Sequence, residues 1–414
     1  MKRVTTGLAI GLLSSQAMAA TATAAAAPSM EEMWELLQQQ QAEIAELKQR
    51  LAATDEEVQM TTEMVEATAT LVEEGGMSGS LASEWASKTS LGGYGEMHYN
   101  NLEDQNGDGD SDQIDYHRYV LFVNHEYSED TRFFSEVELE HSLAGDGKPG
   151  EVELEQAYIE HDLNDATRLR AGLFLVPVGM LNETHEPPTF YGVERNSVEK
   201  NIIPTTWWEG GVALNGELAP GVNYDVAFSS GLSLDSEAGK FKIRDGRQKV
   251  AEADASKGAF TAALSYTGVP GLQVGGAVHY QQDLYQGNFS HEIDAVLVEL
   301  HAAYNNGPFG LRALAASWDI DDDIERIQLG ADTQEGWYVE PSFKVTRDIG
   351  LFARYSQWDN QAGGGGDTEF EQYDVGVNYW LEDNVVFKLD YQVQESPDSE
   401  KELDGINLGV GFNF

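Results

Sequence analysis

The feature that most constrains this chain is a period of two in its apolar residues, which begins at Thr89 and continues to Phe414. Alternation of this kind is typical of β-strands with two different faces. Sixteen candidate strands can be placed after Thr89, separated in strict alternation by seven short turns and eight longer polar loops. Transmembrane barrels have short turns at one end and long loops at the other. The pattern therefore predicts an all-β transmembrane barrel of about 16 antiparallel strands over residues 89–414.

The predicted connections fix which end of the barrel each segment occupies. Most short turns contain the Gly, Pro, Asn or Asp that tight turns require, and they fall at 128–130, 164–166, 219–221, 269–271, 305–308, 347–348 and 382–383. The long loops cover roughly 101–112, 142–150, 175–205, 231–257, 283–293, 319–334, 359–369 and 394–404. An even number of strands returns the chain to the side where it started, so all long loops are expected on the outer side.

The two faces of the strands differ in polarity. Phe387, Leu389 and Tyr391 alternate with Lys388 and Asp390, for example. In a barrel wide enough to hold water, the apolar set contacts lipid and the polar set lines the pore. The predicted pore-lining residues are Arg132, Glu136, Glu138, Glu140, Glu153, Glu155, Arg168, Arg170, Arg312, Lys344, Arg354 and Lys388. Aromatic pairs near strand ends are candidates for interfacial girdles, namely Trp207 with Trp208, Trp337 with Tyr338, and Tyr379 with Trp380.

The N-terminal residues 1–19 have the order of features of a secretory signal peptide. Lys2 and Arg3 are followed by the apolar run Val4–Leu13 and by the small-x-small site Ala17–Ala19. A buried N-terminal helix is the competing interpretation. An Ala-rich linker is expected over 20–29, and a Gly/Ser-containing linker over 75–88.

Residues 30–74 show a seven-residue repeat. Apolar residues recur every seventh position from Met30 to Val72, over about six heptads, although Gln and Thr fill much of the second seam. Such a repeat predicts a coiled coil, and the strand parity places it in the periplasm. A single amphipathic helix on the barrel or on a membrane is the alternative.

Composition excludes several functions. The chain has 25 basic and 71 acidic residues, a net charge of −46, which disfavours nucleic-acid binding on electrostatic grounds. Cysteine is absent, so no disulfide framework holds the exported chain. No nucleophile motif, P-loop or zinc signature is present, and no HExxH spacing occurs among the nine His residues. We therefore expect no enzyme activity and no cofactor beyond a weak Ca²⁺ ion.

The third long loop, 176–204, is the candidate constriction of the pore. It is long, contains Pro187 and Pro188, and carries charges of both signs. Folded inward, it would set a transverse field that favours polar solutes; folded outward, it would be a solvated loop. The residues predicted at the constriction are Asn182, Glu183, His185, Glu186, Tyr191, Glu194 and Arg195.

Two acidic ladders, 136–140 and 151–155, flank one loop and are expected to be antiparallel neighbours. Packed carboxylates repel one another unless they are paired with arginine, a metal ion or protons. Arg132, Arg168 and Arg170 are the expected partners. A cation-selective patch, or a divalent-cation site that also uses His141, Glu183 and His185, are the alternatives.

Two loops carry notable charge patterns. Asp104, Asn106, Asp108, Asp110 and Asp112 resemble a Ca²⁺ loop of the D-x-N-x-D-G type, but Asp115 stands where the bidentate Glu is required. Weak Ca²⁺ binding and a merely solvated loop both remain open. Loop 231–257 gathers five basic residues between Lys240 and Lys249 in an otherwise acidic chain. It could attract anions into the mouth, bind acidic loops or lipopolysaccharide phosphates, or lie exposed.

Scattered motifs resemble a known family. The segment 172–179 (GLFLVPVG) is similar to the Gly-x-Phe-x-x-Pro-x-Gly signature of the phosphate-selective porin O and P superfamily, and 203–212, 350–359 and 376–391 resemble later strands of that family. The terminal strand Ile406–Phe414 resembles the insertion signal of outer-membrane proteins. The resemblance implies a sixteen-stranded, usually trimeric outer-membrane porin that contacts lipid and lipopolysaccharide and passes small hydrophilic solutes or ions. Phosphate selectivity stays open, because residues 89–414 hold 58 acidic and only 20 basic residues.

A structural role is the alternative to a passive diffusion channel. The coiled coil could tether the barrel, as a membrane anchor, to the periplasm or cell wall. The two roles can coexist in one protein.

Overall fold

The computed structural model describes residues 84–107, 109–234, 241–321, 330–397 and 400–414. The predicted signal peptide, the linker 20–29, the coiled coil 30–74 and most of the linker 75–88 lie outside the described residues, and they stay predictions. Among the described residues, no helix has the length and apolar character needed to cross a membrane.

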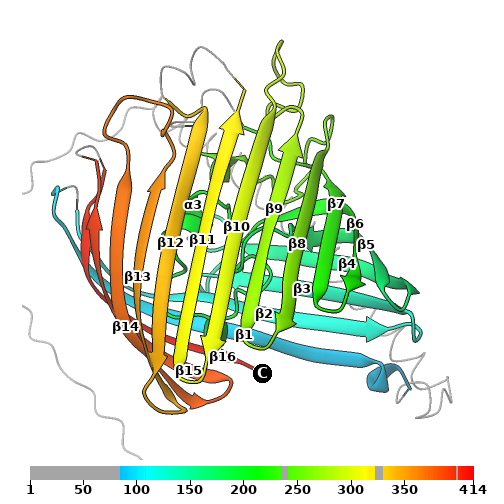
Figure 1. Ribbon diagram of the computed structural model, residues 1–414, viewed down its shortest axis with the longest axis horizontal. Coiled ribbons are helices and arrows are strands. Elements are labelled where there is room, and N and C mark those ends of the chain that lie inside the picture. Colours follow the sequence, from blue (N-terminus) through cyan, green and yellow to red (C-terminus); the bar gives the residue numbers. More distant parts are fainter. Residues whose placement is uncertain (1–83, 108, 235–240, 322–329, 398–399) are drawn as a thin grey trace, which may run out of the picture. The chain divides into compact units, whose positions relative to one another are not determined.

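Sixteen antiparallel strands form one closed barrel (Figure 1), which confirms the predicted fold class. Each strand pairs with its neighbours in sequence, and β1 pairs with β16 to complete the ring. The strands are β1 (Thr89–Asp104), β2 (Ser111–Glu126), β3 (Thr131–Glu140), β4 (Val152–Asn164), β5 (Thr167–Leu175), β6 (Trp208–Ala219), β7 (Val222–Ser229), β8 (Ala259–Val269), β9 (Leu272–Gln281), β10 (Ala295–Asn306), β11 (Phe309–Ile320), β12 (Thr333–Lys344), β13 (Ile349–Asp359), β14 (Phe370–Glu382), β15 (Val385–Glu395) and β16 (Leu403–Asn413).

The seam between β1 and β16 is continuous. Its register runs from Tyr94 opposite Asn413 to Asp104 opposite Leu403. The last residue extends the seam, since the backbone N–H groups of Phe414 and Gly93 each donate to the other's carbonyl, at 2.9 and 3.0 Å. Because this pairing closes the ring, each of the sixteen described strands has a partner on both sides, and none forms a sheet edge.

The alternation in sequence is the alternation of the two barrel faces. On β15, Phe387, Leu389 and Tyr391 are more than two-fifths exposed on the outer face, whereas Lys388 and Asp390 are buried inside. Outward apolar side chains suit contact with lipid tails.

A β-bulge on β4 changes this alternation at one point. Glu136 pairs with Gln156 and Val137 pairs with Leu154, so Glu155 is the extra residue in β4. Bulges re-aim side chains locally. Here the bulge leaves Glu155 and Gln156, which are consecutive in sequence, both buried.

The interior holds a hydrophobic core as well as polar side chains. Loop residues such as Val198, Ile202 and Trp207 pack against Trp318 of β11 and Trp358 of β13. The described residues of these loops include three short helices: η1 (Pro187–Thr189), α3 (Ser197–Asn201) and η2 (Ile243–Gly246). The inward-folded loops therefore fill the side of the lumen next to β9–β13, and α3 is seen inside the ring of strands in Figure 1.

The predicted aromatic girdles are confirmed for only one residue in each of two pairs. Trp337 and Tyr379 are about two-fifths exposed on the outer face. The prediction was wrong for Trp207 and Trp208, which are buried: Trp207 ends the inward loop, and Trp208, the first residue of β6, faces the central cavity. Tyr338 and Trp380 also point inward, and the Trp380 indole donates to the carbonyl of Pro188.

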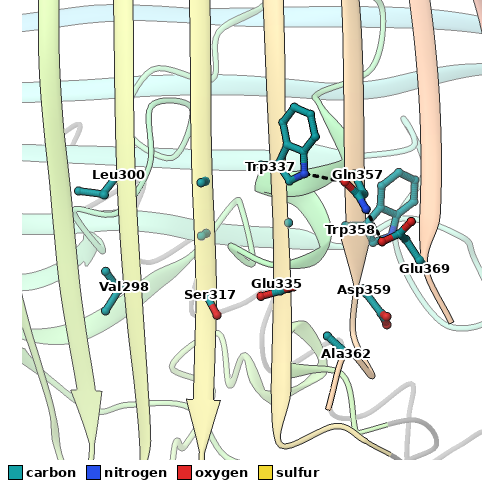
Figure 2. A pocket seen from close by; sticks show the side chains of 13 residues that line it. Val298, Leu300, Ser317, Glu335, Trp337, Gln357, Trp358, Asp359, Ala362 and Glu369 are labelled. Carbon is teal, nitrogen blue, oxygen red and sulfur yellow. Dashed lines mark hydrogen bonds between the residues drawn. The ribbon is translucent and has the colours of Figure 1, made fainter. Parts of the chain in front are cut away.

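Figure 2 shows a pocket in the outer wall, lined by β10–β13 and by the loop that follows β13. The Trp337 indole N–H donates to the amide oxygen of Gln357 at 2.6 Å, and the Trp337 ring packs against Tyr355, which packs against Tyr373. Indole and phenol rings with a polar tip suit the boundary between lipid tails and water. This face is therefore an aromatic belt of the outer wall and does not belong to the pore.

Candidate functional site

The loop between β5 and β6 is closed at its base by one side chain. The Asn182 amide donates to the carbonyls of Val176 and Trp207, at 2.7 and 2.8 Å, and its oxygen accepts from the Trp207 N–H at 2.7 Å. Asn182 is completely buried. These three bonds hold the two ends of the loop together, so the intervening residues form one compact unit.

The far end of the loop reaches strands from both ends of the chain. Glu194 lies 3.0 Å from the His98 imidazole on β1. The Val193 N–H donates to Asp390 on β15 at 2.6 Å. Pro187 packs against Gly411 on β16, where a Cβ atom would lie only 2.3 Å from the Pro187 Cβ. The loop therefore spans the interior and does not extend outward into solvent.

Two inward-facing basic residues are covered by this loop. Arg354 on β13 donates to the Tyr191 carbonyl at 2.6 Å and forms an ion pair with Glu340 at 2.8 Å. The Lys388 ammonium lies 3.6 Å from the centre of the Phe190 ring, a cation–π distance. Both side chains hold the loop in place and are withdrawn from the open part of the lumen.

A buried carboxylate organises the other half of the loop. Glu199 in α3 accepts hydrogen bonds from the Met180 and Leu181 N–H groups, both at 2.6 Å, and from the Tyr338 hydroxyl at 3.1 Å. Asn196 caps the helix by accepting from the Glu199 N–H. A buried carboxylate with this many donors is well satisfied, so Glu199 has a structural role.

The open lumen is bounded on one side by an acidic wall. Its carboxylates come from β1, β3 and β4, where Glu138 and Glu153 are directly opposite each other in the register. Arg118 on β2 is completely enclosed in this wall, with its Nε 2.6 Å from Glu96 and its Nη1 3.9 Å from Glu138.

The opposite side is basic and comes from two loops. Arg244 donates to the Lys200 and Thr205 carbonyls at 2.6 and 2.7 Å, and Arg247 donates to the Thr206 carbonyl at 2.6 Å. Arg195 donates to the Thr206 hydroxyl at 2.8 Å. Neutral acceptors fix all three guanidinium groups, and none of them makes an ion pair within the described residues.

The three guanidinium groups disfavour one another's charge. Burial and the positive charges of Arg247 and Arg195 lower the pKa of Arg244 to about 9. Burial, and then the charge of Arg118, lower the pKa of Arg195. Because like charges are held close together in a partly dehydrated site, an anion placed among them would relieve the repulsion.

The acidic wall and the basic loops enclose a cavity of about 120 Å³. The charged side chains that line it are balanced in number, with six carboxylates and six basic groups, namely Glu96, Glu138, Glu140, Glu153, Glu155, Glu194, Arg118, Arg195, Lys200, Arg244, Arg247 and Lys249. Opposite charges on facing walls produce a transverse electric field, which orients polar solutes and disfavours apolar ones.

The predicted constriction residues have different environments. Asn182 and His185 are buried, Glu194 and Arg195 border the cavity, and Tyr191 packs against Phe352 and Trp380. Glu183 lies 3.7 Å from Arg170, and Glu183 and Glu186 line a separate cavity beside the wall. The sequence thus named residues of one loop, but only some of them border the central cavity.

The partners predicted for the acidic ladders were wrong. Arg132 pairs instead with Glu160 and Asp162, at 2.6 and 2.7 Å, towards the short-turn end of the barrel. Arg168 lies 3.4 Å from Asp162, and Arg170 lies 3.6 Å from Glu160. The reason is the bulge at Glu155, which shifts the β4 register, so that even-numbered residues after it face these arginines.

The ladders find their partners on other segments. Lys249 from the loop between β7 and β8 forms ion pairs with Glu151, at 2.9 Å, and with Glu153. These two contacts raise the pKa of the Lys249 ammonium, although burial alone would lower it. The remaining predicted pore-lining cations lie nearer the loop between β5 and β6, with Arg312 donating to the Thr189 carbonyl at 2.9 Å and Lys344 above the Trp380 ring.

In the described part of the predicted Ca²⁺ loop, the carboxylates accept hydrogen bonds from nearby backbone N–H groups. Asp104 accepts from the N–H groups of Asn106 and Glu402, at 3.1 and 3.0 Å, and Asp110 accepts from the Asp104 N–H at 3.0 Å. Asp112 lies at the start of β2, and Asp108 lies outside the described residues. Ca²⁺ binding stays a prediction.

Sequence reasoning missed five titratable residues of the central cavity: Glu96, His98, His117, Arg118 and Lys200. The signal for Glu96 and His98 was present, because they occupy alternate positions with the inward Tyr94 on β1. Arg118 was harder to assign. A register shift between β1 and β2 near His98 decides which residues of β2 come opposite Glu96.

Comparisons with known proteins agree with this geometry. Residues 91–413 match the family described as phosphate-selective porin O and P. The chain belongs to this porin family. It is 28% identical over 356 residues to an uncharacterized protein of Aquifex aeolicus (strain VF5), which covers 78% of this chain and 80% of that protein.

Solved porin structures share the fold of this porin. An anion-selective porin from Comamonas acidovorans superposes with a TM-score of 0.58 at 13% identity, over 79% of this chain and 99% of that chain. OmpF of Salmonella typhi, in complex with daunomycin, gives 0.57 at 13% identity, over 79% and 97%. The trimer form of OmpT of Vibrio cholerae gives 0.54 at 10% identity, over 79% and 99%. The porin is an outer-membrane diffusion channel for small hydrophilic solutes, and its family and fold are those of a channel.

Proposed function

We propose that the central cavity is the constriction of the channel and that it favours small anions. The observation that carries this proposal is the group of three arginines, Arg195, Arg244 and Arg247, which neutral oxygens hold in place without a carboxylate partner in the described part of the chain. Anion preference requires basic groups concentrated at the narrowest point. The similar barrel from Comamonas acidovorans is an anion-selective porin, which agrees with this proposal.

The acidic wall is compatible with anion preference, because part of its charge is already neutralised. Arg118 pairs with Glu96, and the single positive charge of Lys249 is shared between Glu151 and Glu153. On the basic loops, by contrast, Arg195, Arg244 and Arg247 have no carboxylate partner within the described residues. An anion would pass along the arginines while the opposite wall holds the cations that accompany it.

Reversal potentials across planar bilayers in a KCl gradient test this proposal. Arg195→Gln is the first variant, because its hydrogen bond goes to a side chain and not to the backbone, so loop structure should be preserved. We expect its reversal potential to shift towards cation selectivity, and Glu140→Gln on the facing wall to shift it the other way. Arg347→Gln, on an exposed turn and paired with Asp383, is the matched control and should leave it unchanged. An unchanged potential in both Arg195→Gln and Arg247→Gln would refute the assignment.

We further propose that the porin is a homotrimer in contact with outer-membrane lipid and lipopolysaccharide. Support comes from the family and from the trimer form in which OmpT of Vibrio cholerae was solved. Light scattering of the detergent-solubilised protein should give three chains per particle after subtraction of bound detergent. A mass of one chain per particle would contradict this.

The signal peptide 1–19 and the periplasmic coiled coil 30–74 lead to a second proposed role, a tether between the barrel and the periplasm or cell wall. The seven-residue repeat supports it. Cells with a chain that lacks 30–74 should have a looser envelope, while the conductance of the purified channel stays the same. An unaltered envelope would argue against tethering.

A further inference from the structure

Three buried side chains from separate segments converge beside the acidic wall. Glu136 lies on β3, Glu155 is the bulge residue of β4, and His185 belongs to the loop between β5 and β6. One ligand atom from each lies within 4.8 Å of the others, and each residue is at most 3% exposed. The bulge is what brings Glu155 inward beside Gln156, so this convergence depends on an irregularity of the sheet.

A hydrogen bond at Nδ1 fixes the orientation of the His185 imidazole. His185 Nδ1 lies 2.9 Å from the carbonyl of Asn182, which can only accept, so Nδ1 carries the proton. Nε2 therefore faces the carboxylates, at 3.5 Å from Glu136 and 3.6 Å from Glu155. Metal-binding histidines are typically held by this kind of contact from the nitrogen that does not bind the metal.

The spacing is too long for hydrogen bonds and suits a shared ion. Neither Nε2 of His185 nor Oε2 of Glu155 has a hydrogen-bond partner among the described residues, although both atoms are buried. Buried polar atoms without partners are rare. An ion that lies about 2.0–2.2 Å from each atom in tetrahedral geometry separates its ligands by roughly 3.3–3.5 Å. The two separations from His185 Nε2 are close to this value, and the carboxylate oxygens lie within 4.8 Å of each other.

The surroundings complete the features of a metal site. Glu136 accepts from the Gln156 amide at 2.6 Å and from the Tyr94 hydroxyl at 3.3 Å, which fixes the carboxylate. A cavity of about 220 Å³ borders Glu136 and His185 and leaves room for water in a fourth position. Two carboxylates and a neutral imidazole would balance the charge of a divalent ion.

We propose that Glu136, Glu155 and His185 bind one divalent transition-metal ion of the Zn²⁺ type, which fastens the loop between β5 and β6 to the acidic wall. The imidazole favours Zn²⁺ over Ca²⁺ and Mg²⁺, which prefer oxygen ligands only. The competing occupant is a proton on Nε2, which would make His185 an imidazolium between the two carboxylates. The ion would connect the two sides of the constriction, and its presence would limit motion of the loop.

Metal titration of the folded, full-length protein in detergent tests the proposal. After treatment with a chelator, Zn²⁺ is added in a calorimeter, and Co²⁺ is added separately as a visible-light probe. We expect one saturable ion per chain, and Co²⁺ absorption bands of a tetrahedral site. His185→Gln and Glu155→Gln should each weaken Zn²⁺ binding at least tenfold. His141→Gln, which changes a partly exposed histidine paired with Asp115, should bind Zn²⁺ as the wild type does.

The outcomes are decided by binding and not by ion selectivity. Circular dichroism and the metal-free conductance show whether each variant has folded, and Glu155→Gln serves if His185→Gln has not, since Glu155 Oε2 has no hydrogen bond to lose among the described residues. If the wild type shows no saturable Zn²⁺ binding, the site holds only a proton on His185 Nε2, and the proposal is overturned. Equal Zn²⁺ affinity in the wild type and in a folded Glu155→Gln variant would also overturn it.

Discussion

At the scale of single residues, the pore depends on a few buried side chains that hold backbone segments together. Asn182 makes three hydrogen bonds between the two ends of one loop, and Glu199 accepts from backbone groups of the same loop. Asn182 was named in the sequence only as a member of a long loop, and Glu199 was not singled out, because no spacing in the sequence reveals their hydrogen bonds. Their importance comes from burial, because an orphaned buried donor or acceptor costs far more than an exposed one.

Asn182→Ala should loosen the base of the loop. It leaves the Val176 and Trp207 backbone groups with fewer partners in a buried place, a cost of about 2–4 kcal/mol. We expect a larger and noisier single-channel conductance, measured in planar bilayers. Thr184→Ala, which removes an exposed bond to the Met180 carbonyl, is the control and should conduct like the wild type. Wild-type conductance in Asn182→Ala would contradict the role of Asn182.

Glu194 should make the attachment of the loop between β5 and β6 to the barrel wall (the seated loop) depend on pH. Burial alone would raise the pKa of Glu194, but the neighbouring His98 imidazole holds it well below its usual value, which is about 4.3. The ionised carboxylate therefore stabilises the seated loop above about pH 4, and this contribution is lost progressively as the pH falls further. Hydrogen exchange at Val193 should be about tenfold faster in Glu194→Gln than in the wild type at pH 7. The difference should shrink below about pH 4, and a constant difference would show that the ionised form is not responsible.

At the scale of elements, the strands were predictable from sequence and the interior was not. Strand number and turn positions follow from local alternation, which each strand shows by itself. The register between strands does not follow from local alternation. A bulge such as that at Glu155 reverses which residues face inward without changing local polarity. Trp207 and Trp208 were misassigned for a related reason. An apolar residue at a strand end looks the same whether it meets lipid or an inward loop.

The candidate site was partly predictable. Loop 176–204 and the basic cluster in 231–257 were noticed because of their length and charge. Their meeting could not be foreseen, because Arg195 and Arg247 are joined through the backbone and hydroxyl of Thr206. Contacts between neutral backbone atoms and arginine leave no pairwise signal in one sequence.

Strand β16 contributes to the site through two glycines on its inner face, which leave room for the loop between β5 and β6. On its inner face, Gly411 lies against Pro187, and Gly409 lies against Val193, where an added Cβ would be 2.3 and 3.1 Å away, respectively. Gly411→Val should therefore push the loop from the wall while the barrel still folds, and we expect a changed conductance with an unchanged circular dichroism spectrum. Val410→Leu, on the opposite face of the same strand, is the matched control. A wild-type conductance in Gly411→Val would show that the loop tolerates the added side chain.

At the scale of the whole molecule, charge is separated between the chain as a whole and its pore. The protein is strongly acidic, with a net charge of −46, yet guanidinium groups held by neutral oxygens gather at the central cavity. Distant surface charges act on a permeating ion only through water and salt, whereas the arginines act at contact distance.

Selectivity should therefore depend on salt in a particular way. The Debye length is about 10 Å at 0.1 M and about 3 Å at 1 M, so high salt screens the acidic surface more than the arginines in the enclosed cavity. We expect anion preference, measured as the reversal potential at a fixed concentration ratio, to increase as the mean salt concentration rises. If the preference declines with salt instead, long-range surface charge and not the cavity sets selectivity.

The seam between β1 and β16 is where the first and last strands of the barrel meet, and the inner loop contacts both sides of it. Glu194 bonds to β1, Val193 to β15, and Pro187 packs on β16. The loop precedes β6 and all later strands in the chain, so these contacts can form only once the C-terminal strands have arrived. The loop therefore takes its final position late in assembly. Afterwards the same contacts crosslink the strands on both sides of the seam and stabilise the closed ring.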